Sequence, residues 1–263
     1  MGGDELAGRT VLAVFAHPDD ESLACGGTLA RLADSGVRVI LLCASRGRKG
    51  TISDPGLVGE SDLGRVREEE LRNAAQVLGV DRVDILDHPD GDLYWANIPQ
   101  FQAEIAAAII ECRADTVITF GEDGLYWHPD HIGVYERTLD AVLTLGDQAP
   151  SLYYVTMPKG VMRQIVDAAA AQGWAAPATG PWAIVPDAFG LLAKPPSLVV
   201  NVSPWVPRKL AAVLCHRTQM GVDNPFARIN REDAARLLGV EQFRREEPQL
   251  GYPLLEQLAA QDS

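Results

Sequence analysis

The fold of this chain is decided by TVLAVFAHPDDESLACGGTLARLADSGVRVILLCAS, residues 10–45. Residues 10–16 and 37–45 are apolar runs rich in β-forming residues, a pattern typical of strands that a parallel sheet buries on both faces. Residues 22–36 between them have helical spacing and end on glycine, the residue type favoured just after a helix. This order predicts a βαβ unit, in which the two strands are parallel and the connection is right-handed.

The rest of the chain continues the alternation of strands and helices. Apolar β-forming runs predict four more strands, and helical spacing predicts four more helices. Residues 46–62 are predicted to form a loop, whereas residues 157–195, rich in Ala, Pro and Gly, match neither pattern. The strands are expected at 82–86, 116–120, 151–155 and 197–202, and the helices at 62–80, 98–115, 129–145 and 204–220.

This pattern predicts an α/β fold that is Rossmann-like, with an open, mostly parallel sheet and helices on both faces. The length of 263 residues suffices for one large domain or two small ones. We expect a single domain over residues 1–263. Its core is predicted to span about residues 10–155, while residues 156–263 complete the fold and shape the pocket.

The composition disfavours several partners and compartments. Hydrophobic residues make up 47% of the chain, enough for a sizeable core. The net charge of -13 argues against nucleic acid as a partner, because phosphate binding needs clustered Lys and Arg. The N-terminus lacks the apolar segment of a signal peptide, and no apolar run reaches membrane-spanning length. The four cysteines form no CxxC pair and are interpreted as small buried hydrophobes, so we expect a cytoplasmic protein.

The tripeptide His-Pro-Asp occurs three times, and four of the five histidines lie in or beside these copies. The copies begin at His17, His88 and His128. Each follows a predicted strand, and open α/β sheets bind ligands beyond the carboxyl ends of their strands. The copy at His88 has no second histidine at a suitable spacing, and we interpret it as a polar turn.

The first and third copies offer ligands for a metal. Histidine with carboxylate is the usual ligand set of a catalytic zinc, which takes three protein ligands and keeps one open position. His17 and Asp20 are three residues apart, and so are His128 and His131. If each proline opens a helical turn, residues three apart share a face and converge on one ion. Spacing alone does not choose between Asp19 and Asp20, and helix capping or core packing is the simpler alternative for each histidine.

Five stretches resemble the PIG-L/LmbE family of zinc-dependent N-acetylglucosaminide deacetylases. The paired motifs AHPDDES and HPDH are the most specific, and they occur in the family's order. The others are GRVREEELRNAAQVLGV, similar to the family's Arg-x-x-Glu helix, then DGDL, and a weaker match at HRTQM. The resemblance covers mainly residues 10–155.

The resemblance implies a metal site with a base next to it. It implies that His17, Asp20 and His131 bind zinc. It also implies that Asp19 is the general base, close to the ion without being bound to it. A site of two histidines and one aspartate accepts iron(II) as well, so the sequence leaves Zn2+ and Fe2+ open.

The resemblance also implies roles for residues around the ion. His128 would assist the transition state, with Asp130 orienting its ring and raising its pKa. Tyr126 matches a mobile tyrosine of related mycothiol-pathway enzymes that helps to hold the oxyanion. Contacts with the substrate are implied for three further residues, Arg67, Asp90 and His216.

The implied function is removal of the acetyl group from an N-acetylglucosamine-containing small molecule by zinc-activated water, with thiol-cofactor precursors as the leading substrates. One alternative is an amidase of the same scaffold that acts on a thiol S-conjugate or an antibiotic-linked sugar. Another is a non-catalytic sugar- or metal-binding protein, which would not need Asp19 and His128. A dinucleotide-binding protein is disfavoured because no GxGxxG follows the first strand. We expect a small amino sugar as partner and neither nucleic acid nor membrane, and the sequence leaves a homo-oligomer open.

Overall fold

The frame of the molecule is one mixed sheet. The structure, a computed structural model, describes residues 6–53, 56–178, 181–221, 223–247 and 251–262. Seven strands are found in these residues: β1 (Thr10–Phe15), β2 (Arg38–Cys43), β3 (Arg82–Ile85), β4 (Thr116–Phe120), β5 (Ser151–Thr156), β6 (Leu198–Asn201) and β7 (Val240–Arg245). Their order in the sheet is β3-β2-β1-β4-β5-β7-β6. β1 to β5 run parallel, and β7 is antiparallel to both of its neighbours, β5 and β6.

The predicted mostly parallel α/β sheet is confirmed, and the strand that the sequence did not reveal is β7. Side chains of β7 alternate, with Glu241, Phe243 and Arg245 buried. Oε1 of Glu241 lies 2.6 Å from Nζ of the buried Lys209, and Arg245 lies 3.5 Å from Glu256. Because two of the three inward residues are charged, β7 lacks the apolar alternation that marks a half-buried strand.

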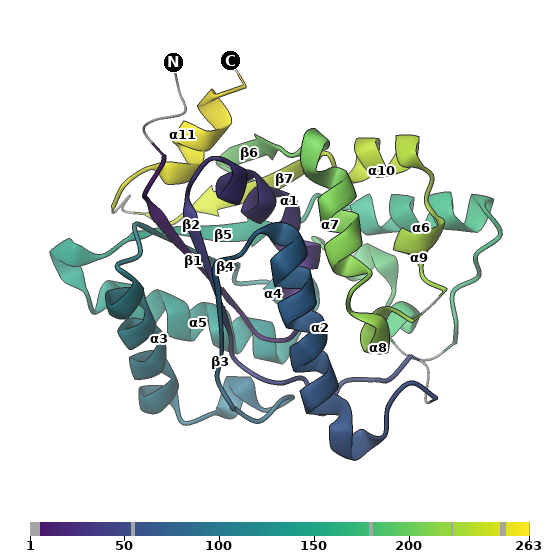
Figure 1. Cartoon of the computed structure of the whole chain (residues 1–263), viewed down its shortest axis with the longest axis horizontal. Coiled ribbons are helices and arrows are strands. Elements are labelled where there is room, and N and C mark those ends of the chain that lie inside the picture. The colour runs from purple at the N-terminus through teal and green to yellow at the C-terminus, as the bar shows by residue number, and fades with distance from the viewer. Residues whose placement is uncertain (1–5, 54–55, 179–180, 222, 248–250, 263) are drawn as a thin grey trace.

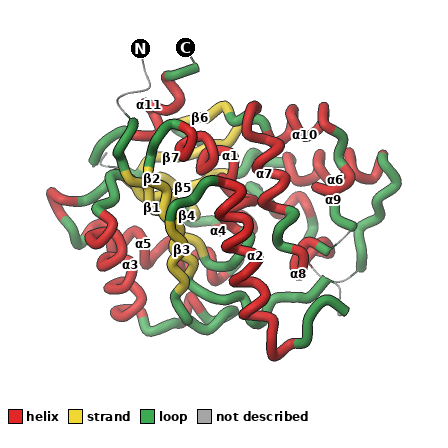
Figure 2. The backbone as a smooth tube through the Cα atoms, viewed as in Figure 1, coloured by secondary structure: helices red, strands yellow, loops and turns green. Residues whose placement is uncertain are grey.

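Helices cover both faces of the sheet, as predicted (Figure 1). On one face α1 (Asp20–Asp34), α2 (Leu63–Leu78) and α7 (Val206–Val213) pack against one another. On the other face α3 (Ile98–Cys112) packs against α5 (Pro129–Leu143). Figure 2 shows the strands as a layer between these two groups of helices.

Local signals set the ends of these helices. α2 is followed by Gly79, whose φ of 81° lies in the left-handed region that terminates many helices. The side chain of Asn97 caps α3. α5 begins at Pro129, a residue type suited to a first helical turn, and the preceding His128 caps it. The third His-Pro-Asp copy is therefore a helix start.

The prediction of one helix over residues 204–220 is wrong, because the chain forms α7 and then the separate α8 (Arg217–Met220). His216 lies in the break, with a fully buried side chain. Its Nε2 is 2.8 Å from Oε1 of Glu21 on α1. The break thus brings together residues that are distant in the chain, and helical spacing does not encode such a contact.

A second apolar cluster lies beside the main core and includes Met162, Ile165 and Phe226. It is built largely from the C-terminal part of the chain. None of the helices in the described ranges combines the length and the hydropathy that crossing a bilayer requires. The remaining helices are α4 (Gly124–Trp127), α6 (Val161–Ala171), α9 (Pro225–Arg228), α10 (Arg231–Leu238) and α11 (Leu254–Ala260), with 3-10 turns at Glu60–Asp62, Leu93–Trp95, Gly146–Gln148, Pro181–Ala183, Pro186–Ala188 and Ser203–Trp205.

The order of the sheet reverses at β1, and this reversal positions the site. β2 and β3 extend from one side of β1, and β4 and β5 extend from the other. At such a switch point the loops after neighbouring strands diverge and leave a crevice in which α/β proteins bind ligands. The loops after β1 and β4 carry the first and third His-Pro-Asp copies, so these two copies meet at the crevice.

Candidate active site

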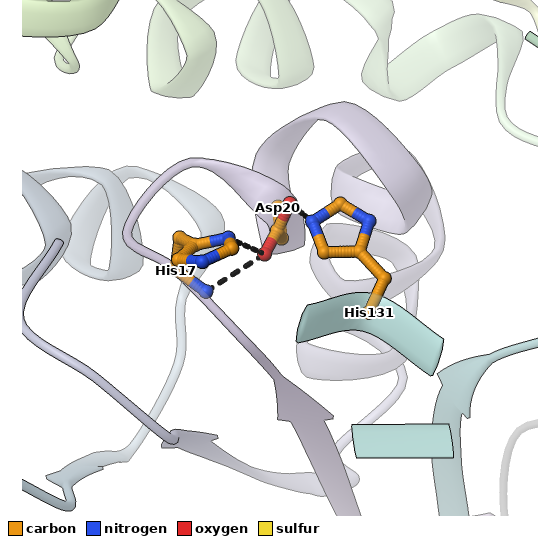
Figure 3. Close-up of side chains that lie close together, drawn as sticks. All are labelled: His17, Asp20 and His131. Atoms are coloured by element: carbon orange, nitrogen blue, oxygen red, sulfur yellow. Dashed lines mark hydrogen bonds and ion pairs between the residues drawn. The ribbon is translucent and has the colours of Figure 1, made fainter. Parts of the chain in front are cut away.

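Two histidines and an aspartate meet at this crevice (Figure 3). His17 follows β1, Asp20 is the first residue of α1, and His131 lies in the first turn of α5. Their ligand atoms all lie within 4.8 Å of one another, and all three side chains are buried. Asp20 lies between the rings, with Oδ2 3.4 Å from Nδ1 of His17 and Oδ1 3.2 Å from Nε2 of His131.

These three residues fit a metal ion. Nδ1 of His131 is 3.1 Å from the carbonyl oxygen of Gly124, and a proton donated there leaves the lone pair on Nε2. That Nε2 is buried and makes no hydrogen bond within the described residues. Its lone pair faces Oδ1 of Asp20 at 3.2 Å, and two buried acceptors facing each other are unfavourable, so an ion held by both atoms would relieve the contact. Two histidines and one carboxylate form the donor set of a catalytic zinc, and iron(II) accepts the same set.

The carboxylate of Asp130 contacts the ring of His17, whereas the ring of His128 accepts the backbone N–H of Asp130. Its Oδ2 is 3.0 Å from Nε2 of His17, and its carboxylate accepts the backbone N–H groups of Gly91 at 2.7 Å and Leu93 at 2.9 Å. Asp130 thus contacts the ring of His128 through its backbone, while the hydrogen bonds of its carboxylate go to His17, Gly91 and Leu93. The carboxylate fixes the ring of a candidate ligand, an arrangement typical of metal-binding histidines.

His128 is a neutral hydrogen-bond donor in this arrangement. Its Nδ1 accepts the backbone N–H of Asp130 at 3.2 Å, so the neutral ring carries its proton on Nε2. Asp130 acts to raise the pKa of His128, as predicted, but burial, and after it the rings of His131 and His17, outweigh it and lower the pKa to about 4. The donors of His17, His128 and Asp130 also lie within 4.8 Å of one another. Because the hydrogen bonds just described engage them, the group with Asp20 fits an ion better.

Asp19 lines the same cavity as the donor atoms, and neither group of potential ligands in the described residues includes it. Its φ is 129°, a conformation that costs a residue other than glycine about 1–3 kcal/mol. Its backbone N–H donates to Oε2 of Glu21 at 3.1 Å, and Nε2 of Gln219 donates to its Oδ2 at 2.8 Å. Burial, and after it the charge of Asp20, raise the pKa of Asp19 to about 7. That value suits a group that takes and returns protons near neutral pH.

A strained turn presents Tyr126 to the same cavity. The flanking Leu125 and Trp127 have φ values of 66° and 67°, which are unusual for bulky side chains. The ring of Tyr126 stands edge-on to the rings of His131 and His128, with centroids 5.4 Å and 5.7 Å away. Burial raises the pKa of Tyr126, so its hydroxyl keeps the proton and can donate it in a hydrogen bond.

Arg67 and Asp90 also line the cavity. The buried Arg67 donates to two backbone carbonyl oxygens of residues 46–51 and thereby holds the loop after β2. Asp90 accepts the backbone N–H of Lys49 at 2.6 Å and lies 3.2 Å from Nε2 of His17. Burial acts to raise the pKa of Asp90, but the hydrogen bond and charge of His17, the backbone N–H of Lys49 and the charge of Arg67 together outweigh it and lower the pKa to about 2. Asp90 is therefore an ionised acceptor.

His216 does not reach the cavity. It is fully buried against Glu21, so the predicted contact with the substrate is wrong. Gln219 in the same stretch lines the cavity instead, and its only signal in the sequence is the weak match at HRTQM. His88 also lies outside the cavity, where its Nε2 is 2.6 Å from Oε2 of Glu104.

The cavity has a volume of about 360 Å³, within the range of small-molecule sites. Part of its lining is polar: His17, Asp19, Lys49, Arg67, Asp90 and Gln219. Another part, here named the apolar wall, consists of Met157, Met162, Trp182, Ile184, Phe189 and Phe226. Residues 157–195, which matched no sequence pattern, thus supply most of the apolar wall.

Comparisons with known proteins place this site among deacetylases. The family model PIG-L, described as GlcNAc-PI de-N-acetylase, matches residues 12–142. A 1D-myo-inositol 2-acetamido-2-deoxy-alpha-D-glucopyranoside deacetylase from Acidothermus cellulolyticus is 32% identical in an alignment of 262 positions. The alignment covers 89% of this chain and 88% of that protein.

Solved structures share the fold. N,N'-diacetylchitobiose deacetylase from Pyrococcus horikoshii has a TM-score of 0.63 at 21% identity, over 90% of this chain and 84% of that one. A 4-carboxy-2-hydroxymuconate hydratase from Pseudomonas putida has a TM-score of 0.64 at 17% identity, over 94% and 99% of the two chains. Because a hydratase shares the fold, the fold alone does not determine the reaction, and the residues of the site have to.

Proposed function

This chain belongs to the PIG-L (GlcNAc-PI de-N-acetylase) family, and on this premise we propose that it removes the acetyl group from an N-acetylglucosamine-containing small molecule. The observation that carries the proposal is the donor set of His17, Asp20 and His131, which lines a cavity of small-molecule size beside Asp19. Hydrolysis of an amide needs an activated water, a base and donors for an oxyanion. The cavity offers residues for each of these tasks.

His17, Asp20 and His131 are the residues that would hold zinc. When bound, the ion supplies positive charge that polarises an amide carbonyl and lowers the pKa of water. The same donors accept iron(II). Elemental analysis of the purified protein identifies which metal it carries.

Asp19 is the proposed general base. Its carboxylate takes a proton from the attacking water and later returns one to the leaving amine. Gln219 fixes one carboxylate oxygen by donating to Oδ2 at 2.8 Å, which leaves Oδ1 for the proton. Burial raises the pKa of Asp19, which makes its carboxylate a stronger base.

His128 and Tyr126 are the proposed donors to the oxyanion. Because the Nδ1 of His128 accepts a backbone N–H, its Nε2 carries the proton that faces the negative oxygen. The protonated hydroxyl of Tyr126 is the second donor. One such donor typically contributes about 2.7–4 kcal/mol to the stability of the transition state.

The sugar is proposed to contact the polar part of the lining. The ionised Asp90 accepts from a sugar hydroxyl, and the ammonium group of Lys49 donates to one. Arg67 is proposed to act mainly by holding the loop that carries Lys49.

The four cysteines are all free thiols, which favours the reducing cytoplasm as the compartment.

Acetate release from a panel of N-acetylglucosaminides tests the proposal. The panel includes the inositol-linked sugar and N,N'-diacetylchitobiose, which the relatives are named for. The zinc-loaded protein is measured beside Asp19→Asn, with Asp147→Asn in an exposed turn as the matched control.

We expect acetate release to collapse in Asp19→Asn while its zinc content is unchanged, and to persist in Asp147→Asn. Zinc lost together with activity in Asp19→Asn would make this residue a ligand. No acetate from any sugar, with zinc firmly held, would contradict deacetylation and favour a different amide or a binding role.

A further inference from the structure

We propose that the substrate carries an apolar group, an alkyl or aryl aglycone on N-acetylglucosamine, and that the apolar wall of the cavity binds it. This inference rests on the proposed deacetylation and names the class of substrate. It departs from the polar inositol for which the Acidothermus relative is named.

The first argument is the division of the lining by chain region. The polar residues follow β1 to β4 or, as with Gln219, hold one of those residues. The apolar wall follows β5, and none of its six side chains carries a charge. Apolar Leu23 and Leu125 also line the cavity from the segments after β1 and β4. All charged and histidine side chains of the lining, however, come from residues before β5, whereas the region after β5 supplies the apolar wall, Met220 and the uncharged Gln219.

The second argument is the size of the apolar wall. The acetyl group presents a single methyl, and the sugar ring presents hydroxyls that pair with polar side chains. Neither can cover six apolar side chains. A polar aglycone placed there would lose its hydration without gaining partners, which is unfavourable. An apolar aglycone would remove both its own surface and that of the wall from water, which is favourable.

The third argument is that the wall is fixed in place next to the catalytic groups. Phe189 packs on Tyr126, with ring centroids 4.5 Å apart. The backbone N–H of Gly190 donates to the carbonyl oxygen of Leu125 at 2.8 Å. Gly190 has a φ of 66°, and a Cβ there would lie 2.2 Å from the carbonyl oxygen of Met157, so the approach requires glycine. An apolar group on the wall would therefore lie close to Tyr126.

Apolar side chains continue from the wall along the same segment. Ile184 is 36% exposed and the following Val185 is 61% exposed. Leu191 and Leu192, just after Gly190, are also exposed. This continuity favours a group long enough to extend beyond the cavity. A longer N-acyl chain in place of acetyl would have the same chemistry, and the experiment separates the two sources.

The test measures kcat/KM of the zinc-loaded protein on methyl, butyl, hexyl and octyl N-acetylglucosaminides and on the inositol-linked sugar. We expect kcat/KM to rise by about fourfold for each methylene that is buried on the wall, until the chain leaves the cavity. A second series lengthens the N-acyl group on the methyl glycoside. A rise confined to the second series would support the apolar subsite and assign it to the acyl chain.

Two variants locate the effect. Ile184→Gln, in the apolar wall, should lower the ratio of octyl to methyl kcat/KM. Ile110→Gln is the matched control, because Ile110 is 63% exposed on α3 and is not part of the cavity lining, and it should leave the ratio unchanged. An equal fall of the ratio in both variants would overturn the assignment to the wall.

Failure of the inference and failure of deacetylation give different results. Acetate released equally well from methyl and octyl glycosides, or best from the inositol-linked sugar, would overturn the apolar group and leave deacetylation standing. If no sugar releases acetate, calorimetric titration of Asp19→Asn with the methyl and octyl N-acetylglucosaminides decides. Tighter binding of the octyl compound would support the apolar subsite, and equal binding would overturn it.

Discussion

The His-Pro-Asp copies at His17 and His88 each follow a parallel strand of the same sheet, yet only the first places its ring in the cavity. β1 lies where the order of the sheet reverses, whereas β3 is an edge strand. His17 contacts Asp20 and two further carboxylates, and His88 contacts Glu104. The position of the strand, and not the tripeptide, decides which histidine can serve a metal.

The two copies also differ in how the backbone turns. In the first copy the residue with positive φ is Asp19, at 129°. In the second it is Gly91, at 79°, a residue type that adopts this conformation without strain. The first copy therefore holds backbone strain at Asp19, the proposed base, whereas the second copy turns at a glycine without strain.

Replacing each histidine by alanine is expected to give the largest contrast. His17→Ala should lower zinc affinity by more than about 100-fold, beyond the 10–100-fold typical of losing only a group that supports a ligand. His88→Ala should keep zinc and acetate release and lose about 1–2 kcal/mol of stability, because its contacts with Glu104 and Phe101 are removed. Calorimetric zinc titration and urea unfolding measure both quantities. Similar zinc affinities in the two variants would erase the contrast.

Removal of the metal should give the next largest effect. A ligand at 100 times its Kd stabilises the folded state by about 2.7 kcal/mol, so chelation should lower the melting temperature of the unaltered protein and of His88→Ala. Added zinc should restore it. His17→Ala should melt at the same temperature with and without chelator. Thermal unfolding scans check this, and an unaltered protein that ignores the chelator would speak against a bound metal.

Asp130→Asn tests whether the carboxylate of Asp130 supports His17 as a metal ligand. The carboxylate of Asp130 contacts His17, so its loss should lower zinc affinity by about 10–100-fold. Asp147→Asn serves as the control. Zinc titration and kcat are measured together, because an unchanged zinc affinity with a reduced kcat would assign the carboxylate to His128 after all.

The smallest expected effect concerns the backbone turns. The free energy of unfolding of Asp19→Gly should exceed that of Asp19→Ala by about 1 kcal/mol, because glycine relieves the strain at φ 129°. Asp19→Gly should therefore unfold at the higher urea concentration. Gly91→Ala should be destabilised by a similar amount, since alanine is strained at φ 79°. Identical midpoints for the two Asp19 variants would mean that this backbone is not strained.

Much of the fold was predictable because buried parallel strands appear as continuous apolar runs, and β1 is buried at every residue. The family predicted from AHPDDES and HPDH is confirmed. The three predicted donors His17, Asp20 and His131 do meet, because their loops leave paired strands at the switch point.

The errors have a common physical origin in contacts across long stretches of chain. The partner of Asp130 is 113 residues away, and the sequence offered only the adjacent His128 as a candidate. His216 is paired with Glu21, 195 residues distant, which draws it away from the cavity. The apolar wall was not predicted because its residues are spread over α6, α9, a 3-10 turn and the loops between them, so no single helical or strand period connects them.

The bond from Gln219 to Asp19 has a consequence for the making of the protein. The three metal donors lie within the first 131 residues, whereas the partner that holds the base is 200 residues beyond it. At about 5–20 residues per second, a ribosome adds Gln219 roughly 10–40 s after Asp19. A growing chain therefore contains all three proposed donors well before the partner that orients the proposed base, and a chain that ends before Gln219 would keep the donors and lose that partner.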